Sequence, residues 1–389
     1  MLQKAELLES AKKNFKKYFD SQAEDILLSP AGLVLLGDHT HYNEGLLISS
    51  AVDLYTAVII KKRDDNTFKV KVGEKPLVSF SNDELAGLTV EQFNTSLVIE
   101  ILKVLKEDEK IVTGFDCYIE TGIPRCTGLG YYTSIIAGFL KAINDCMNLN
   151  LEETEMIEFG FRAQKAKIGK IANRATIKAS LISQKECLIY SDLRRIKPEF
   201  IPFETSKYKV ILFDTFEEII NPRDICNERI DECSVGVKGL KLYIWGIKSL
   251  RDVKPDFLAK HVHMIPRKVY NRCLYNVNER ERVTKVIESY EVDKFPLLGE
   301  KLFESHEDLS TVYELSTDKI DFLVSEAYKS GLFSGAKMIS CSSYRSIFAV
   351  VKNENVNSAV DTLTKSFKEK YGEELSTYVL SFTDGINYN

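Results

Sequence analysis

The sequence lacks the features that would mark a secreted, membrane-bound or nucleic-acid-binding protein. Its eight cysteines include no Cys-x-x-Cys pair, so we expect reduced, mostly structural thiols rather than a disulfide framework or a zinc site. The formal charge of -5 supplies no basic surplus for nucleic acid and no polybasic patch for anionic lipid. No apolar run is long enough to span a membrane, and the N-terminus MLQKAELLESAKKNFKKYF has the pattern of an amphipathic helix, not of a signal peptide. We therefore expect a cytoplasmic protein.

The length and composition fit an α+β protein with two lobes. A chain of 389 residues is too long for one ordinary core and suggests two domains or one large two-lobed unit. Hydrophobic residues make up 44% of the chain, which is enough to form the hydrophobic cores of two lobes. The Pro-bearing stretch Lys197–Tyr208 separates two predicted strands, and we expect it to join domains of residues 1–200 and 201–389.

Several segments have the pattern of β-strands. Leu33–Leu36 predicts a short strand that runs into the loop GDHTHYNEG. The segments AVDLYTAVIIKKR and TFKVKV are separated by the polar turn RDDN, and together they predict a hairpin. Further strands are expected at ECLIYSD, YKVILFDT, GAKMIS and SIFAVV, with TYVLSF as the last.

Helical spacing is clearest in three places. One helix is expected from the apolar residues Tyr132, Ile135, Ile136, Phe139, Leu140 and Ile143. A second covers about 152–166. Near the end of the chain a stripe of Val360, Leu363, Phe367 and Tyr371 predicts a third helix, with Gly372 as its C-terminal stop.

The stretch IPRCTGLGYYTSIIAGFL has the beginning of a phosphate-binding turn. Gly128 and Gly130 precede a helix, and backbone N–H groups at a helix N-terminus point at a bound anion. However, Tyr131 and Tyr132 stand where small hydroxyl residues are expected. Two bulky side chains at this place need an explanation.

The order of motifs resembles galactokinase, of the GHMP small-molecule kinase superfamily, over nearly the whole chain. SPAGLVLLGDHTHYNEG is similar to the galactokinase signature, IPRCTGLGYYTS to the second superfamily motif, and NPRDICNERIDEC to the Y-N-x-R-R-x-E-C helix; LRDV, NERERV, LGEKLFESHEDLSTVYELSTDKID and GAKM follow in family order. The resemblance implies a two-lobed GHMP kinase fold, with an N-terminal mixed-sheet lobe containing a left-handed β-α-β unit and a C-terminal α/β lobe. It also implies an ATP and sugar site between the lobes.

Two catalytic positions of the family are replaced. Galactokinases use an Arg of the first motif and an Asp near the reacting hydroxyl. The Arg position matches Gly32, and counting back from ECLIYSD places Thr176 at the Asp position. No Asp or Glu lies between Ile168 and Gln184, so a shift in register does not restore the acid. Losing a positioned acid or base typically costs ~10²–10⁴ in rate.

The phosphate-binding loops are degenerate as well. The resemblance places Gly128, Leu129, Gly130, Tyr131 and Tyr132 in the phosphate loop, with the two Tyr residues at the Ser positions that would bind phosphate and Mg²⁺. In the third motif four family glycines are replaced by Ser340, Ser342, Tyr344 and Arg345. That loop must follow another path or carry strain, because a non-Gly residue in the left-handed region costs ~1–2 kcal/mol. Arg345 could bind a phosphate, but a surface or salt-bridge role is expected for it.

The sugar contacts of the family correspond to Asp38, His39, His41 and Cys226. His41 stands in place of Asp and Cys226 in place of Tyr, while Asp38 conserves the charge of Glu. Asp38 and His39 could hydrogen-bond sugar hydroxyls; equally, Asp38 could brace its turn and His39 pack beneath it. The HTH sequence offers no third ligand, so no metal site is expected.

These replacements lead to one hypothesis and two alternatives. The first is a galactokinase-like pseudoenzyme without a required cofactor, retained for binding, regulation or a scaffold role, whose partner is a sugar or an unidentified protein. The alternative is a divergent but active sugar kinase that uses Mg-ATP, with Asp192 or Asp38 replacing the missing carboxylate. The second alternative is a sugar sensor that binds a partner protein. The family resemblance implies a monomer.

Overall fold

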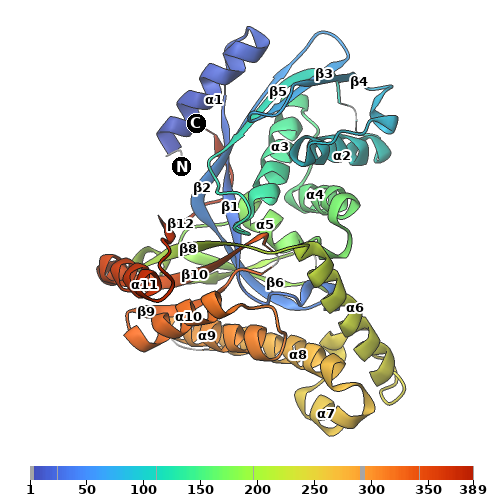
Figure 1. Ribbon diagram of the computed structural model, residues 1–389. Helices are drawn as coiled ribbons and strands as arrows, with labels where there is room; N and C mark the ends of the chain where they lie inside the picture. Colours follow the sequence, from blue (N-terminus) through green and yellow to red (C-terminus); the bar gives the residue numbers. More distant parts are fainter. Residues whose placement is uncertain are drawn as a thin grey trace.

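A computed structural model describes residues 4–23, 25–110, 112–195, 197–289, 294–340 and 342–388. In this part of the chain two β-sheets and their helices form two lobes (Figure 1). The larger sheet has the order β13-β1-β2-β5-β3-β4, with β12 and β6 also paired to β2 and β7 paired to β6. Its strands are β1 (Leu27–Leu36), β2 (Leu46–Lys62), β3 (Thr67–Val72), β4 (Val78–Ser81), β5 (Phe115–Thr121), β6 (Cys187–Asp192), β7 (Glu199–Pro202), β12 (Phe382–Thr383) and β13 (Asn387–Tyr388).

Helices cover both faces of the larger sheet. Helix α1 (Lys4–Phe19) places Leu7, Ala11 and Phe15 on one face, as its amphipathic sequence predicts. The opposite face is covered by α2 (Phe93–Glu107), α3 (Tyr131–Met147), α4 (Glu153–Ile168) and α5 (Arg174–Ile182), as Figure 1 shows. The predicted helices after the Tyr pair and near 152–166 are confirmed as α3 and α4.

The smaller sheet has the order β11-β8-β10-β9 and carries the remaining helices. Its strands are β8 (Tyr208–Glu218), β9 (Phe333–Met338), β10 (Tyr344–Lys352) and β11 (Ser376–Leu380). The helices are α6 (Pro222–Leu240), α7 (Pro255–Lys260), α8 (Arg267–Glu288), α9 (Phe295–Thr311), α10 (Asp318–Ser330) and α11 (Val356–Tyr371). Helix α11 is followed by Gly372, whose φ of 70° lies in the left-handed region that glycine adopts without strain. The predicted stop is therefore confirmed.

Two expectations about the strands are wrong. Strands β2 and β3 do not form a hairpin, because β5 lies between them, antiparallel to β2 and parallel to β3. Arg63 of the connecting turn forms ion pairs with Asp65 and with Asp116 of β5, so this turn crosses β5. Second, β11 is not the last strand, since β12 and β13 follow it and pair with β2 and β1 of the larger sheet. The domain boundary near residue 200 stays a prediction.

Two further sequence expectations concern membranes and thiols. Within the described ranges, no helix combines the length and apolar character needed to cross a membrane. Six cysteines are free thiols, but Cys226 is disulfide-bonded, so the expectation of reduced thiols is wrong for this residue.

Candidate functional site

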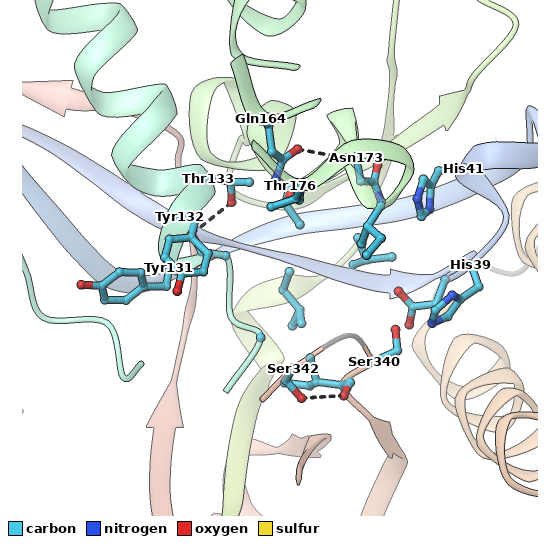
Figure 2. A pocket seen from close by; sticks show the side chains of 18 of the residues that line it. His39, His41, Tyr131, Tyr132, Thr133, Gln164, Asn173, Thr176, Ser340 and Ser342 are labelled. Atoms are coloured by element: carbon cyan, nitrogen blue, oxygen red, sulfur yellow. Dashed lines mark hydrogen bonds between the residues drawn. The ribbon is translucent and has the colours of Figure 1, made fainter. Parts of the chain in front are cut away.

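A cavity of about 220 Å³ lies where the two lobes meet. Strand β1 and the turn after it, the start of α3, the region from α4 to α5, and the segment after β9 all contribute side chains to it. Figure 2 shows Tyr131 and Tyr132 at one end, His39 and His41 at the other, and Thr176 and Ser342 on facing sides. The predicted site residues among its lining are Asp38, His39, His41, Gly128, Gly130, Tyr131, Tyr132 and Thr176. Gly32, Leu129 and Cys226 are not among them.

Gly32 and Thr176, which the sequence resemblance matches to the catalytic Arg and Asp positions, lie against each other. A Cβ atom built on Gly32 would be 2.3 Å from the carbonyl oxygen of Thr176. A Cβ on Gly130 would in turn lie 2.6 Å from the carbonyl oxygen of Gly32. Strand β1, the N-terminus of α3 and helix α5 therefore meet backbone to backbone, and this contact requires glycine at 32 and 130.

Tyr131 is built into the wall of the cavity, whereas Tyr132 is half-exposed. The Tyr131 hydroxyl accepts hydrogen bonds from Asn94 Nδ2 at 3.0 Å and Arg125 Nε at 3.1 Å. Its side chain is 6% exposed, against 44% for Tyr132. The two rings also line a second cavity of about 530 Å³, together with Lys75 and Phe93. The Tyr pair thus forms a partition between two cavities.

Asp38 is held by a buried lysine. Lys337 of β9 is fully buried, and its Nζ lies 2.7 Å from Asp38 Oδ2, 3.7 Å from Glu279 Oε1 and 3.1 Å from Ser305 Oγ. Burial raises the pKa of Asp38 above its ordinary value, while the neighbouring Lys337 ammonium acts in the opposite direction. The bracing role considered for Asp38 is therefore present. The sequence motif GAKM contained this lysine, but nothing in the sequence indicated its partner.

The two histidines near Asp38 are held in their neutral forms. Burial lowers the pKa of His39 well below its ordinary value and that of His41 to about 4. The His39 ring packs against Tyr313, with 5.1 Å between the ring centroids, and it also lines the cavity. Packing and ligand contact are therefore both open to His39. Neutral imidazoles offer one donor and one acceptor each, unlike the carboxylate that His41 replaces.

Four residues of the third motif show none of the left-handed backbone strain that was considered for them. Ser340, Ser342, Tyr344 and Arg345 all have negative φ, and β10 begins at Tyr344. The Ser342 hydroxyl donates to the carbonyl oxygen of Tyr344 at 2.6 Å. Arg345 is 6% exposed, and its guanidinium forms no ion pair within the described ranges. The expectation of a surface or salt-bridge role for Arg345 is wrong.

Neither substitute carboxylate is free in the cavity. Asp192, at the end of β6, binds Arg251 Nη2 through Oδ2 at 3.0 Å and does not line the cavity. Among the described residues of the lining, Asp38 is the one acidic residue, and Lys337 binds it.

Four polar residues of the lining were not predicted from the sequence: Thr133, Gln164, Asn173 and Ser343. Asn173 caps helix α5 by accepting a hydrogen bond from Ala175 N, and Asn173 N donates to Gln164 Oε1 at 3.0 Å (Figure 2). An Asn before a helix is a recognisable cap, so Asn173 could have been found from the sequence IANRAT. Gln164, inside α4, carried no such signal.

Comparisons with known proteins concern the chain as a whole. Residues 13–62 match the galactokinase galactose-binding signature, and residues 96–177 match the GHMP kinases N terminal domain. A protein named galactokinase from Fusobacterium nucleatum is 27% identical over 384 residues, covering 97% of this chain and 99% of that protein. The chain is similar to galactokinases over nearly its whole length. The galactokinase of Staphylococcus carnosus is similar at 26% identity, over 98% of this chain and 99% of the relative.

Solved structures confirm the predicted GHMP kinase fold. Lactococcus lactis galactokinase, solved in complex with galactose, superposes with a TM-score of 0.91 at 23% identity and covers 98% of this chain and 99% of its own. A mevalonate kinase superposes with a TM-score of 0.66 at 17% identity, covering 92% and 99%. The two-lobed α+β fold is thus the fold of this kinase superfamily.

Proposed function

We propose that this galactokinase-like chain is a pseudoenzyme, which phosphorylates galactose far below the rate of an enzyme and is retained for binding or regulation. The observation that carries the proposal is the backbone contact between Gly32 and Thr176. Gly32 and Thr176 stand at the positions where, by the resemblance, the family has a cation and a carboxylate. Phosphoryl transfer depends on positioned charge, and neither residue supplies any.

Mg-ATP is a poor match for the residues that line the cavity. Ligand pockets usually enclose about 300–1,000 Å³, and this cavity has about 220 Å³. The buried Tyr131 ring stands at the start of α3, where a phosphate chain would run. Mg²⁺ favours carboxylate ligands, and Asp38, the single carboxylate that the described residues bring to the lining, is bound to Lys337. We derive no catalytic step through the nucleotide.

A coupled assay with galactose and Mg-ATP tests the proposal. We expect the turnover number to be at least ~10²–10⁴-fold lower than that of an ordinary enzyme, because an acid or base and a cation are missing. The galactokinase of Fusobacterium nucleatum, assayed in parallel, serves as the positive control. A turnover of about 1 s⁻¹ or above for this chain would refute the proposal.

An active sugar kinase is the second candidate, and one observation favours it. Helix α3 begins without a side-chain cap at Gly130, and Gly128 and Gly130 keep the positive φ values of 81° and 58°. Its first N–H groups are a potential phosphate site. A thermal-shift series separates the two candidates, since Mg-ATP at 100 times its Kd would stabilise the fold by about 2.7 kcal/mol. The pseudoenzyme proposal expects no such shift.

The same thermal-shift series with galactose tests the sugar-sensor version. Asp38, His39 and His41 line the cavity, so a sugar could contact them without being phosphorylated. Stabilisation by galactose without turnover would support a sensor, while the absence of any sugar effect would leave the scaffold role.

A further inference from the structure

One surface of the second lobe has a charge opposite to that of the whole chain. Residues 235–268 contain eight Lys and Arg but only two Asp, although the chain carries a net charge of -5. This segment comprises the end of α6, the loop 241–249, helix α7 and the start of α8. We call it the basic tip; Figure 1 shows α7 at the lower extremity of the molecule, with the end of α6 beside it.

Most cations of the basic tip have no acidic partner. Arg251 is paired with Asp192, and Lys268 with Glu228 and Glu232. The other six are at the surface and form no ion pair with any described residue: Lys238, Lys241, Lys248, Lys254, Lys260 and Arg267. Of the two acids, Asp252 is bound to Arg194. The basic tip therefore presents a cluster of uncompensated positive charge.

Large apolar side chains protrude among these charges. Trp245, the single Trp of the chain, is 99% exposed, and Leu242 is 80% exposed. Tyr243 and Met264 are also exposed. Buried residues on either side, Leu240 and Ile247, anchor the loop in the core of the second lobe. The exposure of Trp245 and Leu242 is therefore imposed by the fold.

We propose that the basic tip binds the surface of an anionic lipid bilayer. Trp and Tyr favour the boundary between headgroups and acyl chains, and Leu can enter it, while lysines attract anionic headgroups. Five of the six uncompensated cations are Lys, a residue depleted in protein–protein interfaces, where Arg is enriched. This composition favours lipid over an acidic protein. The net charge of -5 for the whole chain argues against a membrane partner, but this sum hides the local excess of positive charge in residues 235–268.

The single Trp provides a direct probe, because any spectral change must come from Trp245. We expect its emission to shift to shorter wavelength, and the full chain to co-sediment, with phosphatidylcholine vesicles containing about a third phosphatidylglycerol. Pure phosphatidylcholine vesicles should give neither effect. About 1 M salt should abolish binding, because it shortens the Debye length to about 3 Å.

Charge reversal tests the location of the contact. The double variant K241E/K248E retains Trp245, and since each surface lysine contributes roughly fivefold to binding of anionic lipid, it should bind at least ~25-fold more weakly. The matched control is K12E/K13E on α1, where two exposed lysines without ion pairs change the net charge equally. This control should bind vesicles as the wild type does.

Each of the following results would overturn the lipid proposal. Equal loss in both double variants would mean that net charge alone matters. Equal binding to neutral vesicles would exclude headgroup attraction. A Trp245 shift with poly-glutamate or with single-stranded DNA, but not with vesicles, would instead indicate an acidic protein or nucleic acid as partner. None of these outcomes depends on whether the cleft is catalytic.

Discussion

The backbones of Gly32 in β1 and Thr176 in α5 are in direct contact, with 2.3 Å between the carbonyl oxygen of Thr176 and the Cβ position of residue 32. A side chain of any kind at residue 32 would displace helix α5 or strand β1. The two positions that the resemblance matches to the family Arg and Asp are therefore close in space. Restoring either one alone does not rebuild a catalytic pair.

Gly32→Arg is expected to destabilise the fold and to leave galactose phosphorylation unrestored. Gly32→Ala, which adds only the Cβ atom, should lower the free energy of unfolding by about 1–3 kcal/mol, because it overpacks a backbone contact. Urea denaturation measures this change. Gly87→Ala is the matched control, since a Cβ there meets nothing within 4 Å. An unchanged midpoint for Gly32→Ala would show that α5 can move away at little cost.

Tyr131→Phe and Tyr132→Phe should differ in their effect on stability. Removing the Tyr131 hydroxyl leaves the buried Asn94 Nδ2 without its acceptor, which should cost about 1–3 kcal/mol, whereas the exposed Arg125 can bind water instead. Tyr132 is half-exposed, so its variant should stay within about 0.5 kcal/mol of the wild type. Chemical denaturation of both variants checks this order. Equal effects would argue that the Tyr131 hydroxyl is not a structural anchor of the cavity wall.

Helices α1, α3, α4 and α11 and most strands could be predicted from the sequence because their signals are local. The 3/4 spacing in α3, the stripe of α11 and its stop at Gly372 depend only on neighbouring residues. Strand pairing is not local. Residues 46–62 and 67–72 have strand patterns, but nothing within them indicates that β5, almost 50 residues later, lies between them.

The candidate site divides in the same way. Motif order was sufficient to bring Asp38, His39, Thr176 and the Tyr pair to one cavity. The ion pair of Asp38 with Lys337 joins positions about 300 residues apart, so the sequence could not distinguish a free carboxylate from a bound one. The closeness of Gly32 to Thr176 was likewise hidden, because it depends on the packing of two backbones.

Lys337→Met should be strongly destabilising. The substitution removes the cation but leaves the Asp38 and Glu279 carboxylates buried around it, and breaking such a buried pair costs about 3–5 kcal/mol. Lys365→Met is the control, because that side chain is 78% exposed and should change stability by less than about 0.5 kcal/mol. The comparison uses denaturant midpoints at neutral pH. If both variants match the wild type, the buried lysine does not hold Asp38 in place.

His41→Gln should flatten the dependence of stability on pH below neutrality. Burial lowers the pKa of His41 from its ordinary 6.5 to about 4, so between these values the unfolded chain binds a proton that the folded chain does not. The free energy of unfolding of the wild type should therefore fall as the pH drops from about 6.5, and this contribution should level off below about 4. Gln cannot be protonated. Between these pH values the free energy of unfolding of the variant should therefore decrease by roughly 1–3 kcal/mol less than that of the wild type.

Urea denaturation of His41→Gln and the wild type between pH 7 and pH 4 gives the comparison. Carboxylates titrate in both proteins, so their contributions cancel in the difference between the two curves. His39 does not cancel fully, because His41 helps to lower the pKa of His39, and its contribution adds to the same difference. Parallel curves would mean that His41 titrates near its ordinary pKa and is open to water. In that case a charged imidazolium, not a neutral ring, would face the cavity at acidic pH, and the polarity we describe for this end of the site would be wrong.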